Sequence, residues 1–236
     1  MKKINHKTVL ITGHTGGVGL AIAELFLNNK WNVWGLNREG LFNLRSISGK
    51  QPQWNKRVYA HATYYSRMQY ISEAFNDENA KISLFINNAA IFKRKPFNDF
   101  TCDQIYDIIY TNLIFPMYLT KEVIRRMRKD SRIINIGSVA GLRGIKNQAV
   151  YCASKFGLNG FFEALQPELQ KRGILCTTIN PGGIDTPLWN KTNPYPGDTA
   201  KLLKPSDIAS LVWYVANLPA NVVFKNATIY PSNEQH

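Results

Sequence analysis

Residues 10–24, LITGHTGGVGLAIAE, join a short apolar run to an apolar pattern at helical spacing through a turn with glycines at positions 13, 17 and 19. Glycine permits a tight strand-to-helix turn, lets the backbone approach a pyrophosphate and lets the helix pack closely on the strand. The first turn of such a helix offers free N–H groups and a partial positive charge to phosphates. The spacing T-G-x-x-x-G-x-G differs from G-x-G-x-x-G, and a glycine-rich turn that holds no ligand is the alternative interpretation.

The rest of the chain repeats this order of strand and helix. Further apolar runs that predict strands lie at 32–38, 57–63, 82–89, 131–139, 174–183 and 226–231. Patterns that predict helices lie at 18–29, 67–76, 103–129, 151–172 and 205–218. Strands this apolar are buried on both faces, as in a parallel sheet, and repeated β-α order implies helices on both sides. We therefore expect one Rossmann-like α/β domain over residues 1–236, with a doubly wound parallel sheet of about seven strands.

Composition excludes several classes of protein. Apolar residues make up 44% and charged residues 19% of the 236 residues, which suits one large globular domain. No apolar run reaches 18 residues, and the apolar N-terminal run turns into glycines at once, so we expect neither a membrane span nor a signal peptide. The three cysteines are scattered and form neither a disulfide framework nor a metal pattern. A cytoplasmic protein without a metal site is the expectation.

The chain is strongly basic, with 29 Lys and Arg against 16 Asp and Glu and a net charge of +13. This balance fits a solvated basic surface, an anionic cofactor, an acidic substrate or carrier, or a nucleic acid. The densest cluster lies at 121–132 and contains Arg125, Arg126, Arg128 and Lys129. It lacks interleaved aromatic residues and is predicted to lie on a helix that leads into a buried strand, so we expect no nucleic-acid partner.

Tyr151 and Lys155 stand four residues apart at the start of a predicted helix, and side chains at this spacing share one helical face. A free tyrosine has a pKa near 10, too high for ready proton exchange at neutral pH. An ammonium one turn away would stabilise the phenolate and lower that pKa. Ser138 ends the strand at 131–139, at the edge where open α/β sheets bind ligands, and its hydroxyl would donate to a substrate oxygen. Taken singly, each residue also fits a packing or capping role.

Six segments, in this order and spacing, resemble the short-chain dehydrogenase/reductase family over essentially the whole chain. They are TGHTGGVG at 12–19, NNAA at 87–90, Asn112, Ser138, YCASK at 151–155 and NPGGIDT at 180–186. The resemblance implies a Rossmann-fold oxidoreductase that transfers hydride between a nicotinamide cofactor and a carbonyl or alcohol. It implies that Tyr151 is the general acid/base, that Lys155 tunes it and holds the ribose, and that Asn112 holds a water of a proton relay. Such proteins commonly form homodimers or homotetramers through the helices at 103–129 and 151–172.

The end of the second strand bears on the choice of cofactor. An acidic residue there binds the ribose 2′-hydroxyl of NAD, whereas an arginine accommodates the 2′-phosphate of NADP. Here the position resembles Asn37, and Arg38 follows it, so NADP(H) is favoured over NAD(H). The adenine-binding Asp of the family is replaced by Ala62 or Thr63, which puts that contact in doubt. The residues expected to contact the cofactor are Gly13, His14, Thr15, Gly17, Val18, Gly19, Asn37, Arg38, Asn88, Ala89, Ala90, Tyr151, Lys155, Pro181, Gly182, Ile184 and Thr186.

The substrate is expected to bind under a lid at about 185–204, a Pro- and Asn-rich stretch too long for an ordinary connection. The residues expected to line its pocket are Phe92, Val139, Ala140, Arg143, Ile145, Lys146, Leu188, Trp189 and Tyr195. A general carbonyl reductase is the first hypothesis. A 3-oxoacyl-acyl-carrier-protein reductase, with Arg126, Arg128 and Arg172 contacting the acidic carrier, is the second. An NADP-binding regulator without catalysis is the third.

Overall fold

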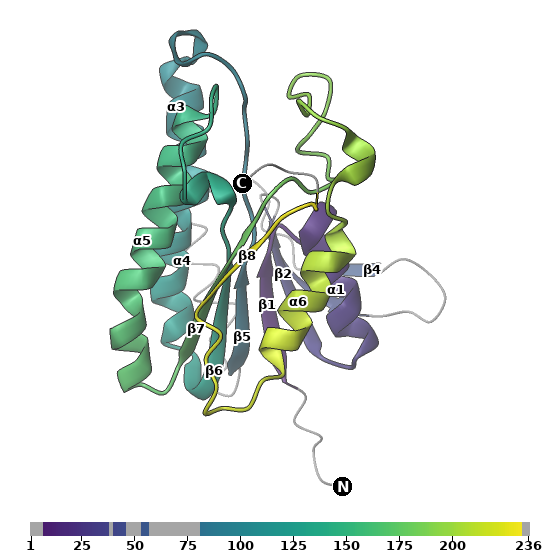
Figure 1. The fold of residues 1–236 in the computed structure, drawn as a ribbon. Helices are drawn as coiled ribbons and strands as arrows, with labels where there is room; N and C mark the ends of the chain where they lie inside the picture. Colours follow the sequence, from purple (N-terminus) through teal and green to yellow (C-terminus); the bar gives the residue numbers. More distant parts are fainter. Residues whose placement is uncertain (1–6, 38–39, 46–52, 57–80, 233–236) are drawn as a thin grey trace, which may run out of the picture.

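The computed structural model describes residues 7–37, 40–45, 53–56 and 81–232, and its sheet has the strand order β4-β3-β2-β1-β5-β6-β7-β8 (Figure 1). Six of these strands run parallel: β2 (Asn32–Asn37), β1 (Thr8–Thr12), β5 (Ile82–Asn87), β6 (Met127–Ile136), β7 (Leu175–Pro181) and β8 (Asn226–Ile229). The predicted Rossmann-like parallel sheet is confirmed.

One edge of the sheet differs from the prediction. Strands β3 (Gly40–Arg45) and β4 (Gln53–Lys56) extend it beyond β2 in antiparallel order. The sequence did not reveal them, because their residues lack the continuous apolar pattern of a strand buried on both faces. The strand predicted at 57–63 and the helix predicted at 67–76 lie outside the described residues.

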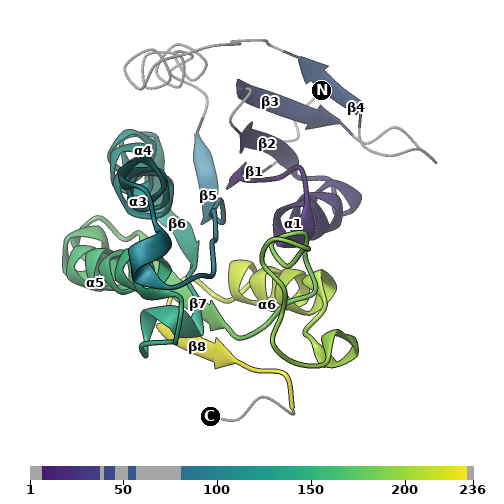
Figure 2. The ribbon, with the colours of Figure 1, turned by 90° about the horizontal axis from the view of Figure 1, so that it is seen from above.

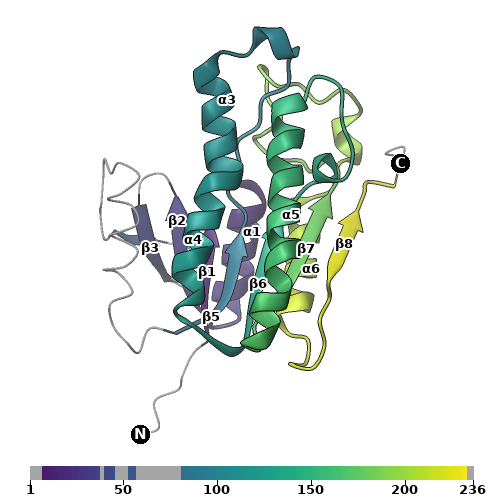
Figure 3. The ribbon, with the colours of Figure 1, turned by 90° about the vertical axis from the view of Figure 1, so that its left-hand side faces the viewer.

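Helices cover both faces of the sheet (Figures 2 and 3). α1 (Gly17–Asn28) and α6 (Pro205–Ala216) lie on one face, where Phe26 packs edge-on against Trp31 and Trp213 at centroid distances of 5.0 Å each. Among the described residues, the opposite face carries α3 (Cys102–Ile109), α4 (Phe115–Ile124) and α5 (Ala149–Lys171). Each face therefore has its own buried apolar cluster.

The long helix predicted at 103–129 is interrupted and shorter. A π-helical turn, η2 (Tyr110–Ile114), separates α3 from α4, and α4 ends at Ile124. Residues from Met127 onward belong to β6, where Met127 is buried and pairs with Ile82 of β5. Arg128 and Lys129 therefore lie at the start of a strand, because burial of Met127 in the sheet outweighs the helical propensity of the basic run.

Tyr118 and Phe156 are exposed apolar side chains on α4 and α5. The homodimer or homotetramer expected through these helices stays a prediction.

Within the described part of the chain, every helix is too short or too polar to cross a lipid bilayer.

Candidate active site

The glycine turn has the backbone that its sequence predicts. Gly13 and Gly17 have φ angles of +69° and +52°, a region that disfavours residues with a Cβ atom. Gly19 serves packing instead, since a Cβ atom there would lie 2.1 Å from the carbonyl oxygen of Gly13. The turn is therefore tight, and α1 begins directly against the end of β1.

The predicted NNAA segment is hydrogen-bonded to this turn. Thr12 Oγ1 accepts from the backbone N–H groups of Asn88 and Ala89, at 2.9 and 3.0 Å. The side-chain Nδ2 of Asn88 donates to the carbonyl oxygen of Thr12 at 2.9 Å and to that of Gly13 at 3.3 Å. The partly exposed Ala89 and Ala90 follow at the carboxyl end of β5, beside the turn. The glycine turn and the NNAA segment, 75 residues apart in sequence, thus form one wall of the candidate cofactor site.

The beginning of α1 fits a nucleotide phosphate. Its first turn has no acidic residue and its N-cap, Gly16, makes no side-chain capping bond, so the N–H groups at this end of the helix are not capped by a side chain. Thr15 and Gly16 are exposed, and an added Cβ at Gly16 would meet no atom within 4 Å. Val18, by contrast, is buried in the core between α1 and the sheet, so its contribution to a cofactor site is limited to its backbone.

The other predicted cofactor residues lie at the carboxyl end of β7. Thr186 is close to Gly17, since its Cγ2 atom would lie 3.0 Å from a Cβ placed there. Pro181 ends β7, Gly182 donates its N–H to the carbonyl oxygen of Ile229 at 2.8 Å, and Ile184 forms a bridge with Leu203. The segment after β7 therefore lies at the same edge of the sheet as the glycine turn.

His14 lies under the turn. It is 1% exposed, and its ring fills the space above Gly35 of β2, where an added Cβ would lie 2.4 Å from the ring. Burial lowers the pKa of His14 to about 4, although a hydrogen bond with the backbone of Leu36 opposes this. His14, which the sequence predicted to contact the cofactor, is thus a neutral imidazole packed into the protein.

The buried imidazole predicts an acid-dependent loss of stability. Its folded pKa of about 4 lies below the ordinary 6.5, so the unfolded chain binds the proton more tightly. The stabilising contribution is complete above pH 6.5 and is lost as the pH falls toward 4, by about 3 kcal/mol in total. Urea unfolding at pH 7 and pH 4.5 should therefore show a smaller pH effect in His14→Asn than in the unmodified protein. An identical pH effect in both proteins would refute this account of His14.

Asn37, which the sequence predicts to contact the cofactor, ends β2. Its Oδ1 accepts from the backbone N–H of Gly40 at 3.1 Å and so stabilises the turn into β3. Arg38, the predicted partner of a 2′-phosphate, lies outside the described residues, as do Ala62 and Thr63. The last residue of β2 is therefore an amide and not a carboxylate, and Arg38 and Glu39 follow it in sequence, outside the described residues.

Tyr151 and Lys155 share one face of α5, as their spacing predicts. The Lys155 Nζ lies 5.8 Å from the centroid of the Tyr151 ring and donates to the carbonyl oxygen of Ile136 at 3.1 Å. Ser138 lies two residues after the end of β6, and its side chain is hydrogen-bonded to Tyr151. Because the Ser138 Oγ already accepts from the N–H of Ala140 at 3.1 Å, its own hydrogen is available for the tyrosine oxygen. The three predicted side chains therefore meet.

Burial dominates the electrostatics of this trio. It raises the pKa of Tyr151 to about 12, with the hydrogen bond from Ser138 opposing the rise, and it lowers the pKa of Lys155 to about 8. The sequence predicted that the ammonium of Lys155 would lower the pKa of Tyr151. In the polypeptide alone the direction is the reverse, because removing a phenolate from water costs more than these neighbours return.

Asn112 lies in the π-helical turn and is fully buried. Its Oδ1 accepts from the N–H of Ile91 at 2.8 Å, and its Nδ2 donates to the carbonyl oxygen of Ile91 at 2.9 Å and to Ser154 Oγ at 3.1 Å. The extra residue of a π turn is a frequent device for directing a side chain at a functional site. Here the amide fastens the segment after β5 to α5, next to the Tyr151–Lys155 face.

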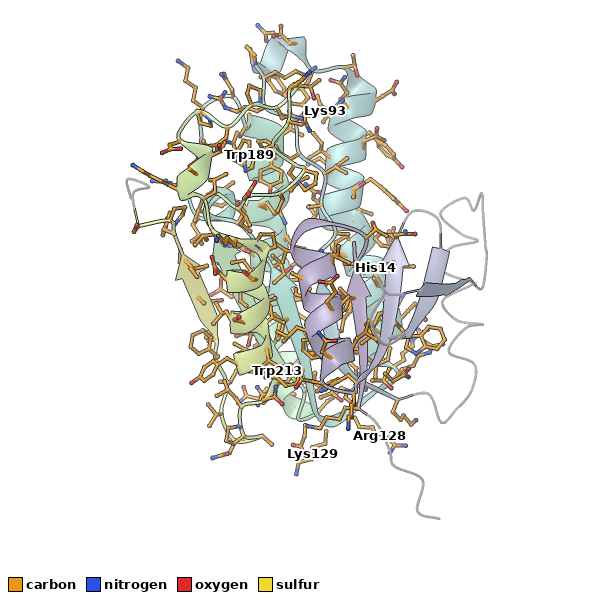
Figure 4. The ribbon with its side chains drawn as sticks, turned by 90° about the vertical axis from the view of Figure 1, so that its right-hand side faces the viewer. His14, Lys93, Arg128, Lys129, Trp189 and Trp213 are labelled. Atoms are coloured by element: carbon orange, nitrogen blue, oxygen red, sulfur yellow. The ribbon has the colours of Figure 1, made fainter. Side chains whose placement is uncertain are left out.

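An aromatic chain covers Tyr151. Phe92 packs edge-on against Tyr151 and against Trp189, and Trp189 packs edge-on against Tyr195, each at 4.9 Å between centroids. Ala140 belongs to the same buried cluster, and Ile145 packs against it. Val139 is buried beside them. The predicted apolar pocket and its lid are therefore in contact in this structure, and Trp189 lies at the same end of the sheet as the glycine turn (Figure 4).

The assignment of Leu188 and Arg143 to the substrate pocket stays a prediction. Leu188 is 39% exposed and is not part of the cluster, and Arg143 lies over the ring of Tyr230, with 5.9 Å between Cζ and the centroid. Tyr230, Cys152 and Asn193 were not predicted. The position of Cys152 next to Tyr151 in sequence could have indicated it, whereas Tyr230 and Asn193 come from segments that are distant in the chain. In the described part of the chain, no three His, Cys, Asp or Glu side chains are close enough to bind a metal ion.

Comparison with known proteins identifies the family of the chain. The family model for short chain dehydrogenases matches residues 7–196. Over 222 residues the chain is 33% identical to the 3-oxoacyl-acyl-carrier-protein reductase FabG of Vibrio harveyi, covering 89% of this chain and 90% of that protein. The solved structure of 4-hydroxyisoleucine dehydrogenase complexed with NADH superposes with a TM-score of 0.79 at 24% identity, covering 96% of this chain and 98% of that one. BdcA in complex with NADPH gives 0.73 at 24% identity, covering 96% and 93%. The protein belongs to the short-chain dehydrogenase family and is an oxidoreductase.

Proposed function

We propose that the protein is an NADP(H)-dependent carbonyl reductase in which Tyr151 is the general acid/base. The observation that carries this proposal is the convergence of Tyr151, Lys155 and Ser138 beside the glycine turn. Relatives and neighbours support the class of cofactor, since solved structures of the fold were obtained with NADH and with NADPH. A panel of ketones and aldehydes with NADPH, followed by the absorbance of the reduced nicotinamide, tests it.

The residues act on the oxygen of the carbonyl. A bound nicotinamide supplies the hydride, and the protein supplies position and charge. Ser138 donates to the carbonyl oxygen and stabilises the negative charge that develops there. Tyr151 gives its phenolic proton to that oxygen, and in the reverse direction it takes the proton from the alcohol. Lys155, held by the carbonyl oxygen of Ile136, places a positive charge beside the phenolate and so offsets the burial that raises the pKa of Tyr151.

The aromatic cover supports the same assignment. Phe92 is 8% exposed and lies between Tyr151 and Trp189, so a substrate that reaches the phenol displaces lid contacts. Lid closure would exclude water from the developing charge and strengthen its electrostatic stabilisation. The segment 185–204 therefore serves as the substrate lid in this proposal.

NADPH should bind more tightly than NADH. Asn37 offers no carboxylate to repel a 2′-phosphate, and Arg38 follows it in sequence. A charge-assisted contact of this kind corresponds to about a 10- to 100-fold difference in Kd. Titration of the protein with each nucleotide, followed by nicotinamide fluorescence, measures the ratio. Arg38→Ala should weaken NADPH binding and leave NADH binding unchanged, and equal affinities in the unmodified protein would remove the assignment.

A 3-oxoacyl-acyl-carrier-protein reductase is the second candidate, favoured by the 33% identity to the Vibrio FabG. The arginines proposed to contact the carrier lie around the end of α4. Arg126 pairs with Glu122 at 3.7 Å, and Arg172 donates to the carbonyl oxygen of Ile124 at 2.8 Å. Arg128 lies at the opposite end of the molecule from Trp189 (Figure 4). A carrier docked there would be remote from Tyr151.

Charge reversal separates the two candidates. If the carrier docks on this cluster, Arg126→Glu with Arg172→Glu raises KM for a carrier-bound oxoacyl substrate and leaves KM for its small thioester analogue unchanged. The absence of a selective change would remove this docking site.

A further inference from the structure

We infer that the substrate of the proposed reductase is an anionic carbonyl compound, in which a short apolar segment separates the reacting carbonyl from a carboxylate or similar anion. This inference rests on the proposed function and names its substrate class. It is carried by three segments around Tyr151, residues 88–96, 139–148 and 185–204, which we call the mouth loops.

Each mouth loop contributes an apolar side chain over Tyr151 and an exposed cation close to it in sequence. Phe92 is followed by Lys93, Ile145 is followed by Lys146, and Trp189 is followed two residues later by Lys191. The three apolar side chains pack around Tyr151, whereas the three lysines are exposed. Figure 4 shows Lys93 at the same end of the molecule as Trp189. The mouth is therefore apolar within and basic at its rim.

Backbone hydrogen bonds hold these cations on adjacent loops. The N–H of Lys95 donates to the carbonyl oxygen of Asn147 at 2.9 Å, which joins the first and second mouth loops. The N–H of Arg94 donates to Asn193 Oδ1 at 2.9 Å, which joins the first and the third. In the third loop, Asn190 and Asn193 exchange backbone hydrogen bonds of 3.1 Å, so the turn that carries Lys191 is internally closed. The basic rim is thus a property of one connected structure.

The rim has a surplus of positive charge that the described residues do not neutralise. The mouth loops contain two carboxylates, Asp185 and Asp198, and Asp198 lies 3.9 Å from Lys201. Lys93, Lys146 and Lys191 form no ion pair with any residue that the structure describes. The other positively charged residues of the mouth loops are Arg94, Lys95, Arg143, Lys201 and Lys204.

Not every cation in this group is available to a ligand. Lys95 is held by the carbonyl oxygen of Asp99, at 2.6 Å, and by Gln104, and Arg143 lies over Tyr230. Lys93 and Lys146 remain as exposed lysines, and each directly follows an apolar residue of the lining in sequence, Phe92 and Ile145 respectively. A ligand that fills the lining would therefore bring a terminal anion to these two lysines, with Coulomb attraction that falls as ionic strength rises.

Binding of a matched pair of probes tests this inference without turnover. We expect hexanoate to quench the tryptophan fluorescence of the protein–NADPH complex at about tenfold lower concentration than hexanamide, which has the same shape without the charge. Lys93→Glu with Lys146→Glu should abolish this difference. Arg128→Glu with Lys129→Glu changes the net charge equally at the other end of the molecule and should preserve it.

Turnover tests the same point on the reaction. The unmodified protein should reduce 5-oxohexanoate with kcat/KM about tenfold above that for 5-oxohexanamide, chiefly through KM, and the preference should shrink at 0.5 M NaCl. In Lys93→Glu with Lys146→Glu, we expect KM to rise for the acid only, with kcat retained. Because both substituted side chains are exposed, we expect this variant to keep its fold. Circular dichroism of the variant checks this expectation.

The outcomes separate the inference from the function beneath it. Equal binding of hexanoate and hexanamide, or a preference for hexanoate that survives in Lys93→Glu with Lys146→Glu, overturns the inference even if both ketones are reduced. Failure of both ketones to react, with NADPH bound, counts against the proposed function and leaves the binding comparison to decide the inference. If Lys93→Glu with Lys146→Glu lowers kcat/KM only for a carrier-bound oxoacyl thioester, the inference is overturned in favour of a carrier protein that docks on the same rim.

Discussion

Replacing Tyr151 with Phe should lower kcat/KM for carbonyl reduction by about 10³-fold, equivalent to about 4 kcal/mol of transition-state stabilisation. The substitution removes the phenolic O–H that delivers the proton and keeps the ring that packs against Phe92. Lys155 and the glycine turn are untouched, so the Kd for NADPH should change by less than about threefold. Steady-state kinetics and nucleotide titration on the same preparation measure both quantities.

Tyr214→Phe is the matched control, because it removes the same atom from an exposed tyrosine on α6. Its kcat/KM should equal that of the unmodified protein. A Tyr151→Phe protein with more than a tenth of full activity would show that another group protonates the substrate. If the unmodified protein binds NADPH tightly and reduces no carbonyl, the protein is a nucleotide-binding regulator without catalysis, and the reductase proposal is wrong.

Gly19→Ala should be the most destabilising single methyl group that can be added to the nucleotide site. The new Cβ would lie 2.1 Å from the carbonyl oxygen of Gly13 and 2.6 Å from Asn88 Nδ2, so backbone must move. Overpacking of this kind costs about 3 kcal/mol, which lowers Tm by about 10 °C in a chain of this size. NADPH affinity should fall as well, since the moved atoms belong to the turn and to the wall that binds it.

Gly16→Ala provides the comparison three residues earlier. Its Cβ would meet no atom within 4 Å, and its φ of −167° suits any residue, so Tm should stay within about 1 °C. Thermal unfolding of the nucleotide-free proteins, followed by circular dichroism, separates the two positions. Equal Tm values for both variants would contradict the packing role assigned to Gly19.

The parts of the site that were predicted correctly rest on short sequence separations. The glycines at 13, 17 and 19 specify a tight turn through their own backbone freedom, and the structure shows two of them at positive φ. Tyr151 and Lys155 meet because residues four apart share a helical face. Ser138 joins them because the carboxyl ends of parallel strands lie at one edge of the sheet, which the β-α order implies.

The parts that were missed depend on residues far away in the chain. His14 is neutral because Gly35 of the neighbouring strand leaves room for its ring, which no pattern around residue 14 announces. The helix predicted through residue 129 ends early because Met127 pairs with Ile82, and the π turn places Asn112 against Ile91.

By itself, the sequence determined the class of fold, the glycine turn and the pairing of a phenol with an ammonium, since these follow from periodicity, backbone freedom and helical geometry over a few residues. Only the tertiary structure decided which side chains are shielded from water and which loops contact one another. It gave Tyr151 a pKa of about 12 and Lys155 a pKa of about 8, and it joined Arg94 to Asn193 across 99 residues. The reason is physical: desolvation and contact depend on everything that surrounds a side chain, and most of those surroundings are distant in the chain.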